Sequence, residues 1–227
     1  MLDSAQCSAV VADILALRER WISRSPCEFY TLGTASYLDD GVEYDTRASQ
    51  LNPILDARFA WLYELLLGAL RTTLDAPVYL ADQKARPGFH VWGVPGIPTG
   101  PEDASLHFDL QYRRLRWPAD AVLDVEHSVS FTLPLRLPRH GGGLAVWDTT
   151  QERVDAFYRR TQFAGSVHDI AVLFEERFEP YACGELVLHS GHVLHRIASV
   201  AEVYPDDLRI CLQGHGLRYG GAWQLYW

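Results

Sequence analysis

Basic residues are scarce in this sequence, and the shortage excludes one common class of partner. The 227 residues include 20 Lys and Arg against 29 Asp and Glu, which gives a formal net charge of −9. Proteins that hold nucleic-acid phosphates by counterion release need the opposite sign, at least locally. The basic residues are scattered, apart from one cluster at Arg113, Arg114 and Arg116. We therefore expect no nucleic-acid partner.

Cysteines and long apolar runs are also few. The four cysteines, Cys7, Cys27, Cys183 and Cys211, form no CxxC pair, which argues against a zinc ribbon or a disulfide scaffold. The longest stretch without a charged residue, 87–101, contains four prolines and four glycines and so indicates a loop or a broken strand. No basic, apolar leader precedes Arg18, the first basic residue. We expect a soluble, reduced, cytoplasmic protein without a membrane partner.

The N-terminal third predicts two helices. Hydrophobic residues make up 48% of the chain and charged residues 22%, as in a globular protein. An apolar stripe at helical spacing runs through the segment 4–22, and a plausible cap precedes it at Asp3 or Ser4. A second apolar stripe indicates a helix over about 51–73, and the segment 23–50 between them is polar and rich in turn residues. We expect residues 1–75 to form a helical support.

The rest of the chain, 77–227, predicts strands. Apolar and polar residues alternate from His127 to Leu137, which is typical of a half-buried strand, and Pro134 indicates an edge or a bulge. Further strands are expected at 78–81, 89–94, 106–112, 144–147, 184–189, 193–200 and 208–217, with a last one in the tail from Trp223 to Trp227. The segment from about 149 to 178 is a polar, partly helical insertion. The chain therefore predicts a mainly β protein with flanking helices in a single domain, 1–227.

One short motif combines two metal-binding residue types. His107 and Asp109 are separated by Phe108, and on a strand such residues point to the same face. An imidazole and a carboxylate on a rigid frame can reach one cation, and a distant histidine would complete the 2-His-1-carboxylate triad of non-haem Fe(II) proteins. Alone, the motif is a weak signal.

The C-terminal third supplies a candidate third ligand and a buried cation. His195 begins the segment His-Arg-Ile, and Arg209 follows it 14 residues later. In the strand 208–217, Arg209 and Cys211 alternate with Leu208, Ile210 and Leu212. An arginine on the inner face is costly unless it pairs with an anion, and its guanidinium fits a carboxylate bidentately.

Together these segments resemble the Fe(II)/2-oxoglutarate-dependent oxygenase superfamily over about residues 107–217. The resemblance implies a double-stranded β-helix (a cupin-like jelly roll) braced by the N-terminal helices. It implies Fe(II) held by His107, Asp109 and His195, with His192 as the alternative to His195. It also implies that Arg209 anchors the distal carboxylate of 2-oxoglutarate, and that O₂ is the second cosubstrate.

The same resemblance suggests roles for the remaining candidate residues. Many members carry Ser or Thr two residues after the arginine, where this chain has Cys211, a weaker donor. Gln111 shares the face of the HxD motif and is a candidate for substrate binding, as are Arg113 and Trp92. The loop 87–101 and the segment 30–44 are candidate lids. We expect a small-molecule substrate, such as a free amino acid or a natural-product intermediate.

Three other interpretations remain open from the sequence. The same cofactors can serve desaturation, epimerisation or cyclisation, and an intact Asp109 argues only against halogenation. A cupin with a histidine-rich metal site would not need Arg209, and a jelly-roll binding protein would need none of these residues. The sequence does not indicate an oligomeric state.

Overall fold

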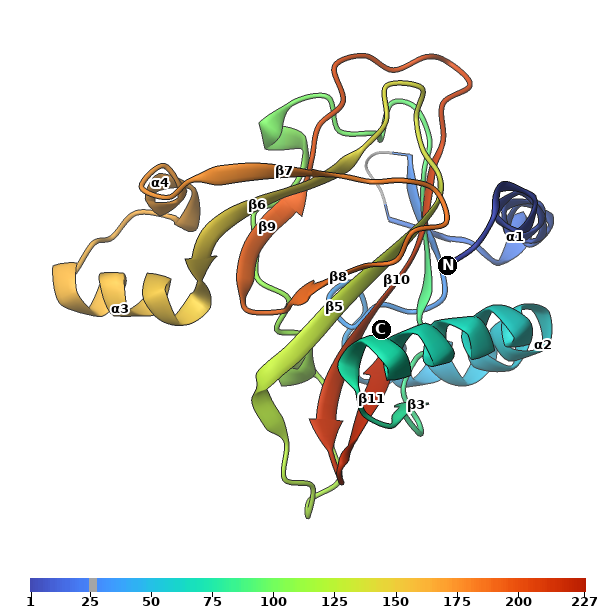
Figure 1. Ribbon diagram of the computed structural model, residues 1–227, viewed down its shortest axis with the longest axis horizontal. Helices are drawn as coiled ribbons and strands as arrows, with labels where there is room; N and C mark the ends of the chain where they lie inside the picture. The colour runs from blue at the N-terminus through green and yellow to red at the C-terminus, as the bar shows by residue number, and fades with distance from the viewer. Residues whose placement is uncertain (25–27) are drawn as a thin grey trace.

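The computed structural model describes residues 1–24 and 28–227, so Cys27 lies outside the described part of the chain. Within that part the fold is two antiparallel sheets with two helices against the larger one (Figure 1). The larger sheet contains β1 (Ile22–Ser23), β2 (Phe29–Leu32), β3 (Val78–Leu80), β4 (Gly88–Trp92), β5 (Asp124–Arg136), β8 (Val187–Ser190), β10 (Arg209–Tyr219) and β11 (Ala222–Tyr226). The one parallel pairing described in it joins β3 to β11. The smaller sheet contains β6 (Gly143–Thr150), β7 (Glu176–Pro180) and β9 (Val193–Ile197).

Helix α1 (Ser4–Ala16) begins where the sequence predicts it and ends earlier. A capping box closes its start, because the Asp3 carboxylate accepts from the Gln6 backbone N–H at 2.8 Å and the Gln6 side chain accepts from the Asp3 backbone N–H at 3.0 Å. The predicted remainder to residue 22 is instead a short 3-10 turn, Arg18–Arg20, followed by β1. The apolar stripe therefore belongs to a helix and the turn that follows it.

Helix α2 (Gly41–Leu74) begins ten residues before the predicted start at residue 51. Tyr44 and Ala48 are buried, and they continue the apolar stripe of Leu51 and Leu55 backwards at helical spacing. The Tyr44 hydroxyl donates to the carbonyl oxygen of Trp227 at 3.0 Å, so this first part of the helix is fixed to the C-terminus of the chain. The prediction started this helix too late because it took the whole segment 23–50 as polar and rich in turn residues.

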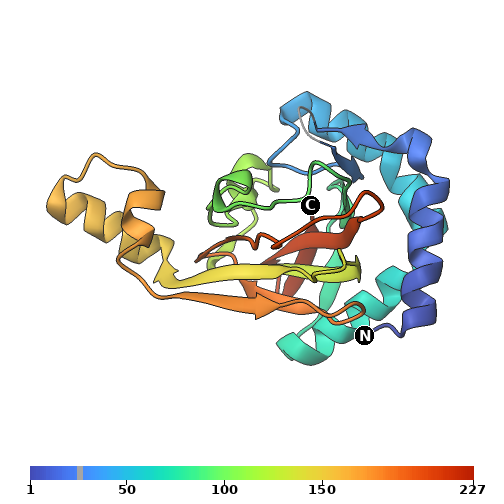
Figure 2. The same cartoon turned by 90° about the horizontal axis from the view of Figure 1, so that it is seen from above.

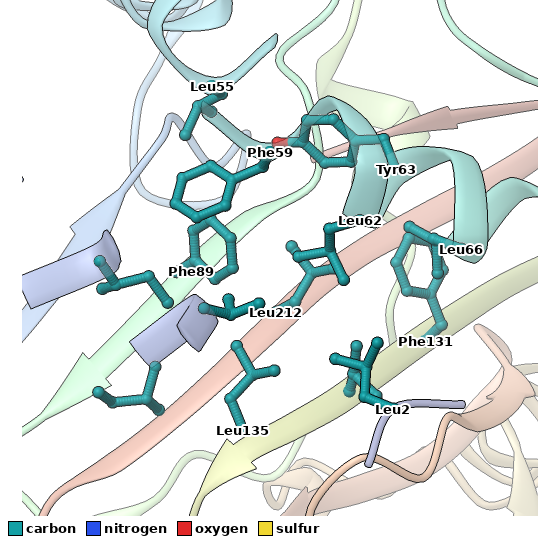
Figure 3. Close-up of a cluster of buried hydrophobic side chains, with 14 of the residues drawn as sticks. Leu2, Leu55, Phe59, Leu62, Tyr63, Leu66, Phe89, Phe131, Leu135 and Leu212 are labelled. Atoms are coloured by element: carbon teal, nitrogen blue, oxygen red, sulfur yellow. The ribbon is translucent and has the colours of Figure 1, made fainter. Parts of the chain in front are cut away.

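The main core lies between these helices and one face of the larger sheet (Figure 3). Leu62 and Leu66 of α2 are fully buried, together with Phe89 of β4 and Leu212 of β10. Burial of each such side chain contributes about 1.5–3 kcal/mol. The helices thereby cover the outer face of the sheet and leave its other face free to carry polar groups.

Strand β10 lies at the centre of the larger sheet. One edge pairs first with β4 and then with β11, and the other edge pairs with β5. Its register with β5 shifts between Ile210 and Cys211, opposite Pro134, as expected for a proline at a bulge. The alternation predicted for 127–137 is confirmed as β5, and that predicted for 208–217 as β10.

The prediction of a strand over 106–112 is wrong. Only an isolated bridge between His107 and His195 forms there, and a 3-10 turn at Gln111–Arg114 follows. The bridge depends on β9, far away in the sequence, so no local pattern specifies where the pairing stops. Strand β7 was also missed, because it lies at the end of the segment interpreted as a polar insertion.

The insertion 149–178 forms an arm that projects from one end of the fold (Figure 2). It contains α3 (Gln151–Thr161) and α4 (Val167–Ala171), and its last residues enter β7, which pairs with β6. In Figure 2 the arm lies on the side away from α1 and α2. No helix of the described residues has the length and apolar character to cross a membrane.

Candidate metal centre and cavity

The backbone brings the three proposed metal ligands together. His107 and His195 exchange two backbone hydrogen bonds of 3.0 Å, and the Asp109 backbone N–H donates to the Gly191 carbonyl at 2.8 Å. A Cβ on Gly191 would lie 2.5 Å from the Asp109 carbonyl oxygen, so only glycine permits this approach. The loop carrying the HxD motif is therefore held against β9 and the turn before it.

The donor atoms of these residues form one compact group. The Asp109 Oδ1 lies 3.4 Å from His107 Nε2, and Oδ2 lies 3.3 Å from His195 Nε2. One ligand atom from each residue lies within 4.8 Å of the others, which is close enough for all three to bind one ion. Asp109 and His195 are buried, and His107 is half-buried.

The Nδ1 atoms of the two histidines determine whether their Nε2 atoms present a lone pair or a hydrogen to the centre of the site. His107 Nδ1 lies 2.8 Å from the Ser105 carbonyl and His195 Nδ1 lies 2.9 Å from the Val193 carbonyl. A carbonyl oxygen only accepts, so both Nδ1 atoms must carry the hydrogen, and both Nε2 lone pairs face the Asp109 carboxylate. Lone pairs facing a carboxylate require a proton or a cation between them.

Electrostatics favour an ionised carboxylate at the centre. Burial opposes ionisation of Asp109, but when a proton occupies the gap between the carboxylate and the rings, the charge of His195 and the hydrogen bonds from both histidines outweigh burial and hold the pKa of that carboxyl well below its usual value. Burial alone would lower the pKa of His107, and the Asp109 carboxylate raises it overall. The site therefore presents a carboxylate to a positive charge.

Gln111 supports the carboxylate and does not line the cavity. It is buried, and its Nε2 donates to Asp109 Oδ1 at 2.7 Å. The Oε1 atom of the same side chain is buried and has no partner among the described residues. This geometry gives Gln111, expected from the sequence to contact substrate, a part in orienting Asp109.

A cavity of ≈ 270 Å³ opens beside the three ligands. The predicted residue Trp92 lines it and stacks on Phe29, with ring centroids 3.8 Å apart. Tyr37 and His90 also line it, and the Tyr37 hydroxyl lies 2.6 Å from His90 Nε2. The segment 30–44 and the loop 87–101, both predicted as lids, therefore contribute to the wall.

Sequence reasoning did not single out Phe29, Tyr37 or His215 for this cavity. His215 follows Gln213 on the inner face of β10, and the strand alternation that identified Arg209 extends to it. Its Nδ1 lies 2.9 Å from the Ser130 hydroxyl. The lining contribution of Phe29 and Tyr37 depends on packing against distant strands, which no local motif records.

Arg209 lies on the same face of β10, beyond Gln213. It is 2% exposed, and its guanidinium carbon lies 5.4 Å from the centre of the Tyr181 ring. None of the ion pairs formed within residues 1–24 and 28–227 includes Arg209. Cys211 beside it is buried, which raises the pKa of its thiol. A buried cation thus lies near the cavity without a described carboxylate partner.

The other sequence candidates lie elsewhere. Arg113 is exposed and donates to Gln151 Oε1 at 3.0 Å. His192, the alternative third ligand, has its Nε2 2.7 Å from the Val125 carbonyl and is not part of the three-residue group. Arg218, the second arginine of β10, is exposed.

Comparison with known proteins identifies solved structures that share this fold. The sequence matches no protein-family model and no curated protein. An N-substituted L-amino acid dioxygenase from Burkholderia ambifaria, solved in complex with alpha-KG, is 15% identical with a TM-score of 0.56, covering 100% of this chain and 83% of that one. The alpha-ketoglutarate-dependent carbocyclase SnoK from nogalamycin biosynthesis is 14% identical with a TM-score of 0.51, covering 96% and 76%. AviO1 from Streptomyces viridochromogenes is 12% identical with a TM-score of 0.50, covering 96% and 85%. The chain therefore has the jelly-roll fold of the Fe(II)/2-oxoglutarate-dependent oxygenases.

Proposed function

We propose that this protein is an Fe(II)- and 2-oxoglutarate-dependent oxygenase that hydroxylates an unactivated C–H bond of a small molecule. The observation that carries the proposal is the group of His107, Asp109 and His195, whose Nε2 lone pairs and carboxylate face one another beside a cavity. The shared fold supports it, because two proteins with that fold are a dioxygenase and an alpha-ketoglutarate-dependent carbocyclase.

The donor set fits iron. Two neutral imidazole nitrogens and one carboxylate occupy three positions of an octahedral ion and leave the other three open, as the facial triad of non-haem Fe(II) does. Both imidazoles are oriented from behind by backbone carbonyls, and Gln111 orients the carboxylate. These supports fix the ligands before the ion binds.

The surroundings of Arg209 fit 2-oxoglutarate. A buried guanidinium without a carboxylate partner is costly, and the distal carboxylate of the cosubstrate would provide one. Cys211 lies beside Arg209 and offers only a weak S–H donor to that carboxylate. The hydroxyl of Tyr181, a buried residue whose ring lies under the guanidinium, is the stronger donor of the two.

The remaining residues position the substrate and exclude water. Phe29 and Trp92 form an apolar part of the wall of the ≈ 270 Å³ cavity that the three ligands also line. When bound, iron and 2-oxoglutarate would supply O₂ activation and hydrogen abstraction from the substrate, with release of succinate and CO₂. The protein holds one C–H bond close to the open positions and keeps bulk water away.

The same site is compatible with desaturation, epimerisation or cyclisation, since these reactions share the ligand set. A cupin that binds metal without 2-oxoglutarate is the second candidate. Arg209, a buried cation with no carboxylate partner in the described part of the chain, argues against it, because a cupin would gain nothing from such a cation. A non-catalytic jelly-roll binding protein is the third candidate. The oriented group of His107, Asp109 and His195 argues against it.

The proposal includes the domain organisation, cellular location and partners of the enzyme. We take residues 1–227 as one domain in which the helices of 1–75 support the sheets. A cytoplasmic location would provide Fe(II), 2-oxoglutarate and a reducing environment for the buried thiols of Cys7 and Cys211. We assign it a small-molecule substrate, and no nucleic acid or membrane.

An anaerobic titration tests the proposal. Addition of Fe(II) and then 2-oxoglutarate to the metal-free protein should produce a visible charge-transfer band only when both are present. Folded protein without such a band would overturn the assignment. Metal binding that is indifferent to 2-oxoglutarate would favour the cupin.

A further inference from the structure

The cavity lacks any permanently cationic side chain. Among the described residues that line it there is no Lys or Arg, and the carboxylates are those of Asp103 and Asp109. The three residues outside the described part, 25–27, are not basic either. Arg209, the buried cation near the cavity, is outside this lining and would be paired with 2-oxoglutarate, so the cavity offers a substrate no further fixed positive charge.

His90 does not supply that charge. It is 5% exposed, and burial, followed by the repulsion of Arg209, lowers its pKa to about 3. With the Tyr37 hydroxyl at its Nε2, the neutral ring is part of the wall. Its edge faces the ring of Phe29, with centroids 4.9 Å apart.

One wall of the cavity is an aromatic panel, formed by Phe29, Tyr37, His90 and Trp92. Phe29 and Trp92 are stacked with an angle of 11° between their planes. The strands β2 and β4 that carry them are paired, with Phe29 opposite Trp92, so the panel is held by the sheet backbone. A rigid aromatic surface binds flat apolar groups and rings.

The two features together select a class of substrate. Transfer of a carboxylate or phosphate from water into a site without a free cation is strongly unfavourable, whereas burial of a ring against the panel is favourable. We propose that the substrate is an apolar, ring-containing molecule that carries no acidic group. This inference rests on the proposed function, because it takes the panel as a wall of the cavity in which the metal would react. It excludes free amino acids and favours neutral natural-product intermediates.

A matched pair of probes tests the inference. The protein is loaded anaerobically with Fe(II) and 2-oxoglutarate, and 3-phenylpropan-1-ol is compared with 3-phenylpropanoate by calorimetry and by the shift of the charge-transfer band. The alcohol should bind more tightly by about tenfold or more, equivalent to about 1.4 kcal/mol. Equal or tighter binding of the acid, or no binding of either probe, would overturn the inference.

A pair of variants at the rim provides the converse test. Leu38 lines the cavity and is 38% exposed, so a longer side chain can be accommodated there. Leu38→Arg adds the missing cation and should shift the preference toward the acid by about tenfold. Leu38→Gln, the neutral control, should keep the preference for the alcohol. An unchanged preference in Leu38→Arg would contradict the electrostatic argument.

The design separates this inference from the proposed function. If the charge-transfer band never forms, the proposed function fails, and the two probes are compared by calorimetry on metal-free protein that carries Arg209→Ala, because Arg209 without 2-oxoglutarate would otherwise offer the acid a cation. The panel needs no iron, so the alcohol should still bind more tightly. Loss of that preference would overturn the inference independently of the reaction.

Discussion

His107 and His195 are joined through their backbones, since each N–H donates to the carbonyl of the other at 3.0 Å. Their side chains leave this bridge on the same side and reach Asp109 with both Nε2 atoms. The distance between the two imidazoles is therefore set by main-chain pairing and not by side-chain packing. A pair of ligands fixed in this way should keep its geometry in the absence of metal.

Asp109→Asn should abolish Fe(II) binding. The amide replaces one carboxylate oxygen with a donor and removes the negative charge that offsets the ion. Metal content after reconstitution and the anaerobic charge-transfer band measure the loss. Asp120→Asn, at an exposed position, is the matched control and should retain the metal. Iron bound at the wild-type level in Asp109→Asn would contradict the ligand assignment.

Arg209→Ala should weaken 2-oxoglutarate binding while iron binding persists. Truncating one partner of a buried charge pair costs about 2–5 kcal/mol, which is a loss of about 30-fold or more in affinity. Titration of the band against 2-oxoglutarate measures it. Arg218→Ala, which removes an exposed arginine of the same strand, is the control. A normal 2-oxoglutarate requirement in Arg209→Ala would move the anchor elsewhere.

Cys211→Ser should tighten 2-oxoglutarate binding. A hydroxyl donates better than a thiol, and one added hydrogen bond contributes about 1 kcal/mol, or about fivefold in affinity. Cys183→Ser, at an exposed cysteine, is the control and should change nothing. Weaker binding in Cys211→Ser would mean that the residue packs against Arg209 and does not meet the cosubstrate.

The ion pair between Asp39 and Arg24 should make stability depend on pH in acid. Burial raises the pKa of Asp39, but the hydrogen bonds and charge of Arg24, followed by the charge of Arg47, lower it overall below the ordinary 3.8. A lowered folded pKa gives stability that is present above the unfolded value and is lost as pH falls toward the folded one. Stability should therefore decrease as the pH drops below about 4.

Asp39→Asn isolates this dependence. Urea unfolding as a function of pH should show less loss of stability in acid than in the wild type. At neutral pH the variant should be less stable by about 3–5 kcal/mol, because Arg24 is left buried and unpaired. Asp40→Asn is the neighbouring control, since the Asp40 side chain is exposed and makes no capping hydrogen bond. Identical pH profiles in Asp39→Asn and wild type would contradict the prediction.

Leu62→Ala should destabilise the fold by about 2–5 kcal/mol, because it removes a fully buried side chain between α2 and the larger sheet. Leu65→Ala is on the same helix but 40% exposed, and should cost much less. Chemical denaturation of both variants provides the comparison. Equal losses would contradict the assignment of Leu62 to the core between α2 and the larger sheet.

The sequence predicted those parts of the site that depend on short-range pattern. Alternation in β10 identified Arg209 as an inward-facing residue, and the HxD spacing identified two members of the ligand group. The structure brings His195 to them by a backbone bridge that joins positions far apart in the chain. Only the resemblance to a known family, and no spacing in this chain, could indicate that partnership beforehand.

Features that depend on tertiary contacts could not be predicted. The hydrogen bond from Gln111 to Asp109 requires the 3-10 turn at Gln111–Arg114, and the pattern there indicated a strand. The hydrogen bond from Tyr44 to the carbonyl oxygen of Trp227 joins residues at opposite ends of the chain. The stacking of Phe29 on Trp92 requires the pairing of β2 with β4, and β2 has too few residues to show a period.

The two faces of strand β10 have different roles, so the effect of a mutation there should depend on whether its position is even- or odd-numbered. Even-numbered positions such as Ile210 and Leu212 are fully buried in the core with the helices. Odd-numbered positions from Arg209 to His215 lie on the opposite face, where Gln213 and His215 line the cavity. In a deep mutational scan, intolerance at the even positions should appear as loss of abundance, and intolerance at the odd positions as loss of turnover at normal abundance.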